Sequence, residues 1–121
     1  MHALLIVAHG SRLQSYSEEI DLLVSRLKGQ LTNFDQIEYA FLELAEPGIT
    51  KACDHLIDSG ASRISIFPYF LAAGRHITED IPDEVNKVSA SHTEVEISLL
   101  DYFGSTENIF NALCQELKSQ S

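Results

Sequence analysis

The sequence predicts an α/β protein in which helices cover both faces of a four-stranded, mostly parallel sheet. Four short segments, near residues 3–8, 37–44, 63–69 and 95–100, are apolar or alternate in the manner of strands. Each precedes a segment whose apolar residues recur every three or four positions, as on one face of a helix. The connections between them are short. A strand-helix order repeated in this way implies right-handed crossovers between parallel strands.

The first strand, residues 3–8, is a continuous apolar run, which suits a strand covered on both faces. Ser11 is the expected N-cap of the helix that follows it. In the second unit, Pro47 is expected in the first turn of a helix that ends near Gly60. The inner face of the first helix is expected to consist of Leu13, Tyr16, Ile20, Leu23, Val24, Leu27 and Leu31.

The third helix is expected at 80–88, and the last helix after Ser105, its expected cap. We expect both helices to pack their apolar faces on the sheet, and Cys53 and Cys114 to be buried thiols that act as small hydrophobic side chains. The inner face of the last helix would consist of Ile109, Phe110, Leu113, Cys114 and Leu117.

Length and charge limit the classes of function. The 121 residues suffice for one domain with a single core, which we place at 1–121. The formal charge of −10, from 18 acidic and 8 basic residues, argues against a nucleic acid or an anionic membrane as partner. No apolar run approaches the roughly 18 residues of a membrane span, and the N-terminal run lacks the features of a signal peptide. We therefore expect a cytoplasmic protein.

Titratable side chains follow the first three predicted strands. His9, Glu43 and His76 each come at or just after a strand end, and the carboxyl ends of parallel strands share one edge, where ligands bind. Other readings remain open: His9 as a loop histidine that bonds its own turn, and His76 as a surface histidine at a helix N-terminus. Glu43 lies between two leucines, so either its side chain reaches the crevice or its strand is an edge strand.

Two histidines and a carboxylate suit a borderline divalent metal such as cobalt, iron, nickel or zinc. Arg12 and Arg75 lie near the two histidines, either as ordinary surface cations or as anchors for substrate carboxylates. Tyr69 and Phe70 are expected to pack, the alternative being an aromatic wall for a flat ligand. Gly74 is expected to give the backbone freedom before Arg75.

Three segments together resemble the small class II chelatases of the cobalamin and sirohaem pathways, the short sirohydrochlorin chelatase family. They are A-H-G-S-R at 8–12, F-L-E-L-A-E-P at 41–47 and P-Y-F-L-A-A-G-R-H-I-T-E-D-I-P at 68–82. The resemblance implies a single-lobe, flavodoxin-like three-layer sandwich. It also implies insertion of a divalent metal into sirohydrochlorin, with release of two protons and no nucleotide. The metal is typically cobalt, with iron or nickel as alternatives.

The resemblance also implies roles for individual residues. His9 would be a metal ligand and the base that accepts pyrrole protons, His76 the second metal ligand, and Glu43 a catalytic residue that faces the macrocycle or assists the metal. Because sirohydrochlorin carries eight carboxylates, we expect arginines, Arg63 among them, to bind it. Substrate binding is assigned to Glu43, Leu71, Ala72, Ala73, Gly74, Arg75, His76, Arg12 and Ser11.

Larger chelatases of this kind have two similar lobes around a cleft, whereas this chain has one, so we expect a homodimer whose crevices face each other. Two other classes of protein fit the sequence less well. A receiver-like or other flavodoxin-like binding module would favour acidic residues after the first strand and a late lysine, where this chain has His9 and Arg12. A histidine phosphatase would show R-H-G, but Ala8 replaces that arginine. A module that binds metal or tetrapyrrole without catalysis is a further alternative.

Overall fold

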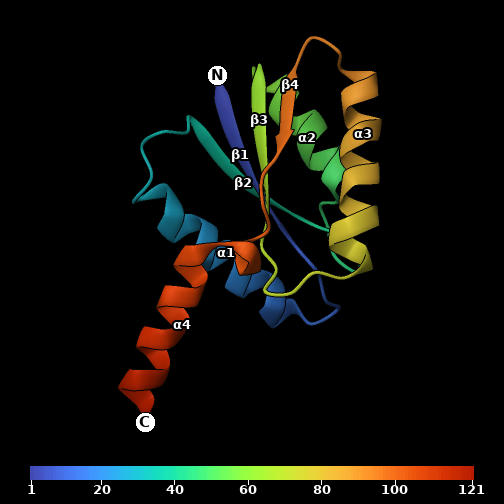
Figure 1. Cartoon of the computed structure of the whole chain (residues 1–121). Coiled ribbons are helices and arrows are strands. Elements are labelled where there is room, and N and C mark those ends of the chain that lie inside the picture. Colours follow the sequence, from blue (N-terminus) through green and yellow to red (C-terminus); the bar gives the residue numbers. More distant parts are fainter.

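The computed structural model contains one four-stranded parallel sheet, with the strands in the order β2-β1-β3-β4 (Figure 1). It describes the backbone of all 121 residues and every side chain except that of His76. The strands are β1 (His2–Ala8), β2 (Gln36–Phe41), β3 (Arg63–Pro68) and β4 (Glu96–Leu99). The helices are α1 (Gln14–Lys28), α2 (Ile49–Asp58), α3 (Ile81–Ser91) and α4 (Glu107–Gln120), with short helical turns η1 (His76–Asp80) and η2 (Phe103–Ser105). The predicted fold class is confirmed.

β1 is an inner strand, and every residue from Ala3 to Ala8 is buried, which explains its continuous apolar sequence. In the register of the sheet, Ala8 lies opposite Phe41 of β2, and Val7 lies opposite Pro68 of β3. The three strands therefore end side by side. The loops that follow them meet at one edge, which we call the carboxyl edge.

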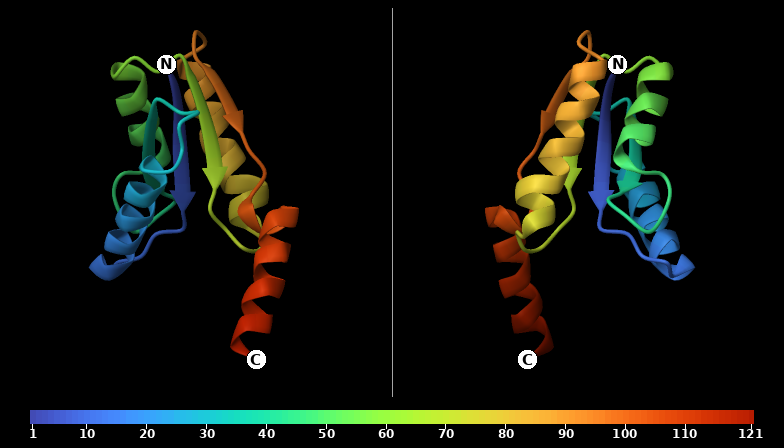
Figure 2. Two further views of the ribbon diagram at one scale, coloured as in Figure 1. Left: turned by 90° about the vertical axis from the view of Figure 1, so that its left-hand side faces the viewer. Right: turned by 90° about the vertical axis from the view of Figure 1, so that its right-hand side faces the viewer.

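Helices cover the two faces of the sheet unequally (Figure 2). α2 and α3 cover one face, where Leu5 and Ile66 of the sheet belong to the same buried cluster as Leu56 of α2 and Val85 of α3. α1 covers the other face over β1 and β2, with Val24 in a second buried cluster. In the usual three-layer arrangement a fourth helix would lie beside α1, over β3 and β4.

α4 does not take that position. It projects past the carboxyl edge and away from the sheet (Figures 1 and 2), and none of its residues is buried. Phe110, Leu113 and Leu117 remain 58%, 53% and 60% exposed. The expectation that this helix packs on its own sheet was wrong, and so was a buried Cys114, which is half-buried. Helical periodicity predicts an apolar face, but it does not identify the surface that covers that face.

Helix boundaries also differ from the predictions. Ser11 is not the N-cap of α1; its Oγ accepts a hydrogen bond from the Leu13 N–H at 3.1 Å, and Leu13 holds the cap position. Pro47 lies in the loop before α2 rather than in its first turn. Thr106, not Ser105, caps α4. Among the described residues, no helix is both long and apolar enough to cross a membrane.

Candidate active site

Three loops follow the strands at the carboxyl edge: 9–13 after β1, 42–48 after β2 and 69–75 after β3. We call the surface that they share the crevice. The first two loops continue the pairing of their strands for a short distance. The Leu42 N–H donates to the Ala8 carbonyl at 2.9 Å, and the Glu43 N–H donates to the His9 carbonyl at 3.1 Å. His9 and Glu43 are thus adjacent at the backbone before their side chains interact.

The side chains of His9 and Glu43 form a hydrogen-bonded pair. His9 Nε2 and Glu43 Oε1 are 2.8 Å apart, and the two side chains are 46% and 48% exposed. An ionised carboxylate only accepts, so the imidazole donates from Nε2. Both groups are half open to solvent, which leaves them accessible to a ligand in the crevice.

Gly10 permits the close approach of these two loops. Its φ is +103°, a conformation that glycine adopts at little cost, and a Cβ atom at this position would lie 1.8 Å from the carbonyl oxygen of Glu43. Any side chain at position 10 would therefore push the 42–48 loop away from His9. The glycine of the A-H-G motif sets the geometry of the histidine before it.

Phe70 forms an aromatic wall beside His9. The two rings are nearly parallel, at 20°, with centroids 6.1 Å apart. Phe70 also packs against the main buried cluster, as expected, whereas its role as a wall for a flat ligand stays a prediction. Tyr69 instead stacks on Phe103, with centroids 6.1 Å apart. His9 therefore lies between a carboxylate and an aromatic ring fixed in the core.

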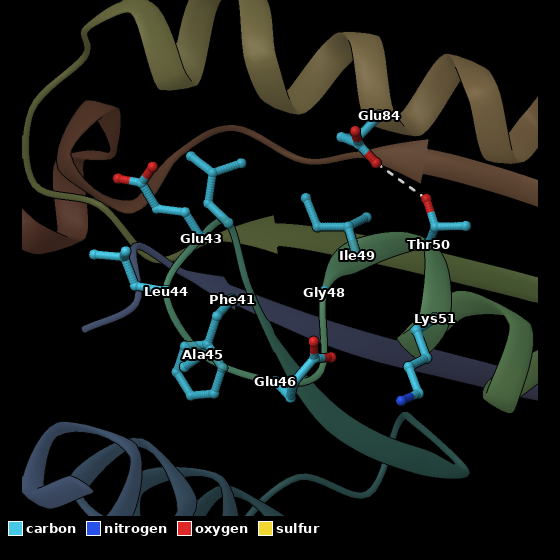
Figure 3. Close-up of a pocket in the computed structure, with 11 residues that line it drawn as sticks. Phe41, Glu43, Leu44, Ala45, Glu46, Gly48, Ile49, Thr50, Lys51 and Glu84 are labelled. Atoms are coloured by element: carbon cyan, nitrogen blue, oxygen red, sulfur yellow. Dashed lines mark hydrogen bonds between the residues drawn. The ribbon is translucent and has the colours of Figure 1, made fainter. Parts of the chain in front are cut away.

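The 42–48 loop encloses a cavity of about 640 Å³ against the starts of α2 and α3 (Figure 3). The acidic side chains of Glu43, Glu46 and Glu84 line it, with Lys51 as the basic one. The Thr50 hydroxyl donates to Glu84 at 3.0 Å, which joins α2 to α3 across the cavity. With three carboxylates and one amine, the cavity suits a cation better than a polyanion.

Leu44 in this loop has a left-handed backbone, with φ of 67°, and its side chain is 49% exposed. A leucine in this region costs of order 1 kcal/mol, and such residues gather at ligand sites where the surrounding structure enforces them. The Phe41 N–H donates to the Pro47 carbonyl at 2.8 Å and closes the loop around Leu44. The loop is therefore fixed by its own hydrogen bonds.

The 69–75 loop places Leu71, Ala72, Ala73, Gly74 and Arg75 in exposed positions at the carboxyl edge. Arg75 is 81% exposed and its Nε lies 3.5 Å from Glu79 Oε2. The Gly74 φ lies outside the left-handed region, and a Cβ there would meet nothing within 4 Å, so the predicted need for backbone freedom was wrong.

The other predicted basic residues divide between the two edges of the sheet. Arg12 is exposed in the 9–13 loop, at the same edge as Arg75, and Ser11 beside it is half-buried. Arg63 begins β3 at the opposite edge, where it pairs with Glu96 at 3.9 Å. Arg63 therefore lies at the far edge from the crevice, and the expectation that it binds substrate there was wrong.

The predicted second metal ligand lies outside the described residues, because the side chain of His76 is not described; its backbone begins η1. Among the described residues, no three His, Cys, Asp or Glu side chains form a group that could hold a metal ion. In the described part of the crevice, His9 and Glu43 place an imidazole beside a carboxylate. This pair suits a transient metal contact better than a closed structural site.

Known proteins are similar to this chain over most of its length. The chain matches the CbiX family over residues 3–120. It belongs to that family. A sirohydrochlorin ferrochelatase from Priestia megaterium is 36% identical over 97% of this chain, and the chain spans 44% of that protein. A sirohydrochlorin cobaltochelatase from Sulfurisphaera tokodaii is 29% identical over 98% of this CbiX chain and 92% of its own length. The solved structure of SirB from Bacillus subtilis with Fe³⁺ has a TM-score of 0.86 and 29% identity, covering 99% of this chain and 47% of that one.

Three site residues of this CbiX protein received no specific role from sequence reasoning. Gly10 lies inside the A-H-G motif, and its position directly after the histidine was the available signal. For Phe70 the sequence predicts packing, or a wall for a flat ligand, but not a contact with His9, because sequence does not show which ring faces the histidine. The left-handed backbone of Leu44 has no sequence signal, since leucine rarely adopts it.

Proposed function

We propose that this chain is a sirohydrochlorin chelatase, which inserts a divalent metal into the macrocycle without a nucleotide. The observation that carries the proposal is the 2.8 Å contact between His9 and Glu43 at the carboxyl edge of the sheet. Membership of the CbiX family supports it, because relatives that match most of this chain are named sirohydrochlorin ferrochelatase and cobaltochelatase. Residues 1–121 would form one chelatase domain.

Metal insertion releases two protons from pyrrole nitrogens as two metal-nitrogen bonds form. In the proposed mechanism, His9 contacts the incoming metal and, once the metal has passed to the macrocycle, accepts a released pyrrole proton, which then passes to solvent through the exposed side of the ring. Glu43 acts with His9 by fixing its orientation and by stabilising the imidazolium once it carries the proton. His76 would be the second metal ligand, as the family resemblance implies.

The charges of the crevice suggest opposite sides for the two substrates. The cavity beneath Glu43 has an excess of carboxylates, which attracts a divalent cation and repels a polycarboxylate macrocycle. Phe70 stacks on His9, and the exposed 71–75 loop with Arg75 follows it in the chain. We propose that the macrocycle stacks over Phe70 and the 71–75 loop with its carboxylates near Arg75, Arg12 and Ser11, while the metal approaches from the side of Glu43.

Cobalt is the metal that we propose, with ferrous iron and nickel as alternatives. An imidazole with a carboxylate suits all three, and intrinsic affinity does not separate them by pathway. The relatives named above include both iron and cobalt enzymes. We further propose that the protein acts in the cytoplasm as a homodimer whose crevices face each other, since its match covers only half of the Bacillus subtilis chain.

Anaerobic absorbance spectroscopy tests the activity. Sirohydrochlorin is mixed with cobalt, ferrous iron or nickel, with and without the protein and its His9→Ala and His76→Ala variants. We expect the wild type to accelerate metallation above the spontaneous rate, and both variants to lose at least about 100-fold of that acceleration. A folded wild type that accelerates none of the three metals would disprove the enzyme and favour a module that only binds metal or tetrapyrrole.

A further inference from the structure

Within the described residues, two surfaces of this chain lie uncovered: an apolar helix face and a groove with a mixed polar and apolar lining. The first, which we call the α4 stripe, runs along one face of α4 and consists of Ile109, Phe110, Leu113, Cys114 and Leu117. It includes three of the most exposed large apolar residues of the chain. α4 has 14 residues, so the stripe belongs to an arm about 21 Å long. Exposed apolar surface of this extent marks an interaction site.

The second surface is a groove of about 390 Å³ between α1 and the end of β3, which we call the α1 groove. Its apolar lining comes from Tyr16, Ile20, Leu22 and Leu23 of α1 and from Tyr69 after β3. It lies on the face of the sheet that α1 covers only in part, where a three-layer fold would place a fourth helix. Figure 2 shows α4 diverging from both α1 and the sheet, so this chain's own helix does not fill the groove.

We propose that the α4 stripe docks in the α1 groove of a second copy of this chain, and that the second copy returns the same contact. The interaction deepens the homodimer of the proposed function and rests on it. A two-fold dimer needs a surface that complements itself, and a helix and a groove on the same chain meet that need twice per dimer. Two helix-in-groove contacts bury more apolar surface than a pairing of single side chains.

The longer relative supports a second copy as the occupant. The Bacillus subtilis structure is matched over 99% of this chain, which includes α4, yet the match covers only 47% of that chain. An equivalent of α4 is therefore present there, beside a remainder about as large as this whole chain. The charges agree as well: Glu19 and Arg26 line the α1 groove, and Glu116 and Lys118 flank the α4 stripe, so each charge can find an opposite one.

Docking of α4 would also act on the active site. The Gly104 N–H, in the turn before α4, donates to the Phe70 carbonyl at 2.8 Å, and a Cβ at Gly104 would lie 1.7 Å from the Leu71 carbonyl oxygen. Leu71 and the start of the α4 stripe line one small apolar cavity of about 210 Å³. The substrate loop and the α4 arm are therefore joined, and the partner copy would border the site through Leu71.

Sedimentation velocity at micromolar concentration tests the surface without any tetrapyrrole. Leu113→Asp changes the stripe and Leu22→Asp the groove, and both side chains are more than half exposed, so each variant is expected to fold. We expect each to raise the dimer dissociation constant by at least about 100-fold, because a carboxylate would be buried in an apolar contact. Gln115→Asp, on the opposite face of α4, is the matched control and should remain dimeric.

Mixing the two variants distinguishes this exchange from other dimers. A heterodimer of Leu22→Asp with Leu113→Asp keeps one intact helix-in-groove contact, whereas either variant alone keeps none. A purification tag at Met1, at the opposite edge of the sheet, should therefore recover the untagged partner from the mixture and not from either variant alone.

A dimeric Leu22→Asp protein would overturn the exchange but leave the proposed homodimer standing, and a monomeric wild type would overturn both. Neither result depends on chelatase activity, so failure of the proposed reaction is a separate finding.

Discussion

Gly10 lies so close to the main chain of Glu43 that a Cβ atom at position 10 would be 1.8 Å from the Glu43 carbonyl oxygen. The Glu43 N–H also donates to the carbonyl of His9, the neighbour of Gly10, at 3.1 Å. These two backbone contacts hold the loops after β1 and β2 together. The 2.8 Å contact between the His9 and Glu43 side chains depends on that close approach.

Replacement of this glycine should therefore damage both the fold and the site. We expect Gly10→Ala to lower the free energy of unfolding by about 2–4 kcal/mol, since alanine is strained at φ of +103° and the Glu43 loop must move. At temperatures where the variant is still folded, its initial rate of metallation should nevertheless be lower than that of the wild type. Thermal unfolding followed by circular dichroism, with initial rates of metallation, measures both effects.

Gly74→Ala is the matched control for stability, because a Cβ at Gly74 would meet nothing within 4 Å and its φ is outside the left-handed region. It lies at the same edge of the sheet. Equal losses of unfolding free energy for the two variants would mean that any alanine in these loops is harmful, and that the approach of Gly10 to Glu43 has no special role.

The charge of Glu43 is tested by Glu43→Gln, which keeps an oxygen acceptor for His9 and removes the negative charge. We expect kcat for metal insertion to fall by about 10- to 100-fold, because the carboxylate no longer stabilises the imidazolium formed when His9 takes a proton. The KM for sirohydrochlorin should change little. Glu46→Gln, which removes a charge from the same cavity, should retain the wild-type kcat at saturating metal. Wild-type kcat in Glu43→Gln would remove Glu43 from the mechanism.

The sequence could predict the meeting of His9 and Glu43 because it depends on topology alone. Parallel strands end at one edge, so polar residues that follow neighbouring strands must meet. The position of α4 depends on what lies beside it, and neither periodicity nor composition contains that information. Of the five residues expected to face inward, Phe110, Leu113 and Leu117 are more than half exposed. The pattern predicts an apolar face, and in the proposed exchange a second copy covers that face in place of the chain's own sheet.

Arg75 and its neighbour Glu79 offer a test of substrate anchoring. The Arg75 side chain is 81% exposed and pairs only at 3.5 Å, so the pair contributes little to stability. We expect Arg75→Ala to raise the KM for sirohydrochlorin about 5- to 10-fold without a change in melting temperature, because a substrate carboxylate loses its guanidinium. Glu79→Gln should lower KM, since it releases Arg75 from competition. Steady-state rates at varied sirohydrochlorin concentration measure both.

Arg63→Ala is the control for that experiment, since Arg63 has a similar ion pair at the opposite edge of the sheet. Its KM should equal that of the wild type. A rise in KM for Arg63→Ala as large as that for Arg75→Ala would indicate a general effect of net charge on a polyanionic substrate rather than a local anchor.

The thiol of Cys53 provides a measure of the integrity of the core. Cys53 lies in α2 with no exposed surface, and burial, with a smaller effect of the neighbouring Asp54, raises its pKa to about 12. The folded state thus disfavours the thiolate. Because the folded pKa is above the unfolded value of 9.0, the contribution to stability is complete below pH 9 and is lost as the pH rises toward 12.

A Cys114→Ser variant, in which Cys53 is the remaining thiol, should therefore resist Ellman's reagent at pH 8 and react fully in denaturant. Above pH 9 its free energy of unfolding should fall with a slope that approaches about 1.4 kcal/mol per pH unit from this group. Tyrosines and lysines also titrate there, so the double variant Cys53→Ala with Cys114→Ser supplies the baseline. Rapid labelling of native Cys114→Ser at pH 8 would show that α2 opens locally, and the structure of the core around Cys53 would then be looser than these contacts imply.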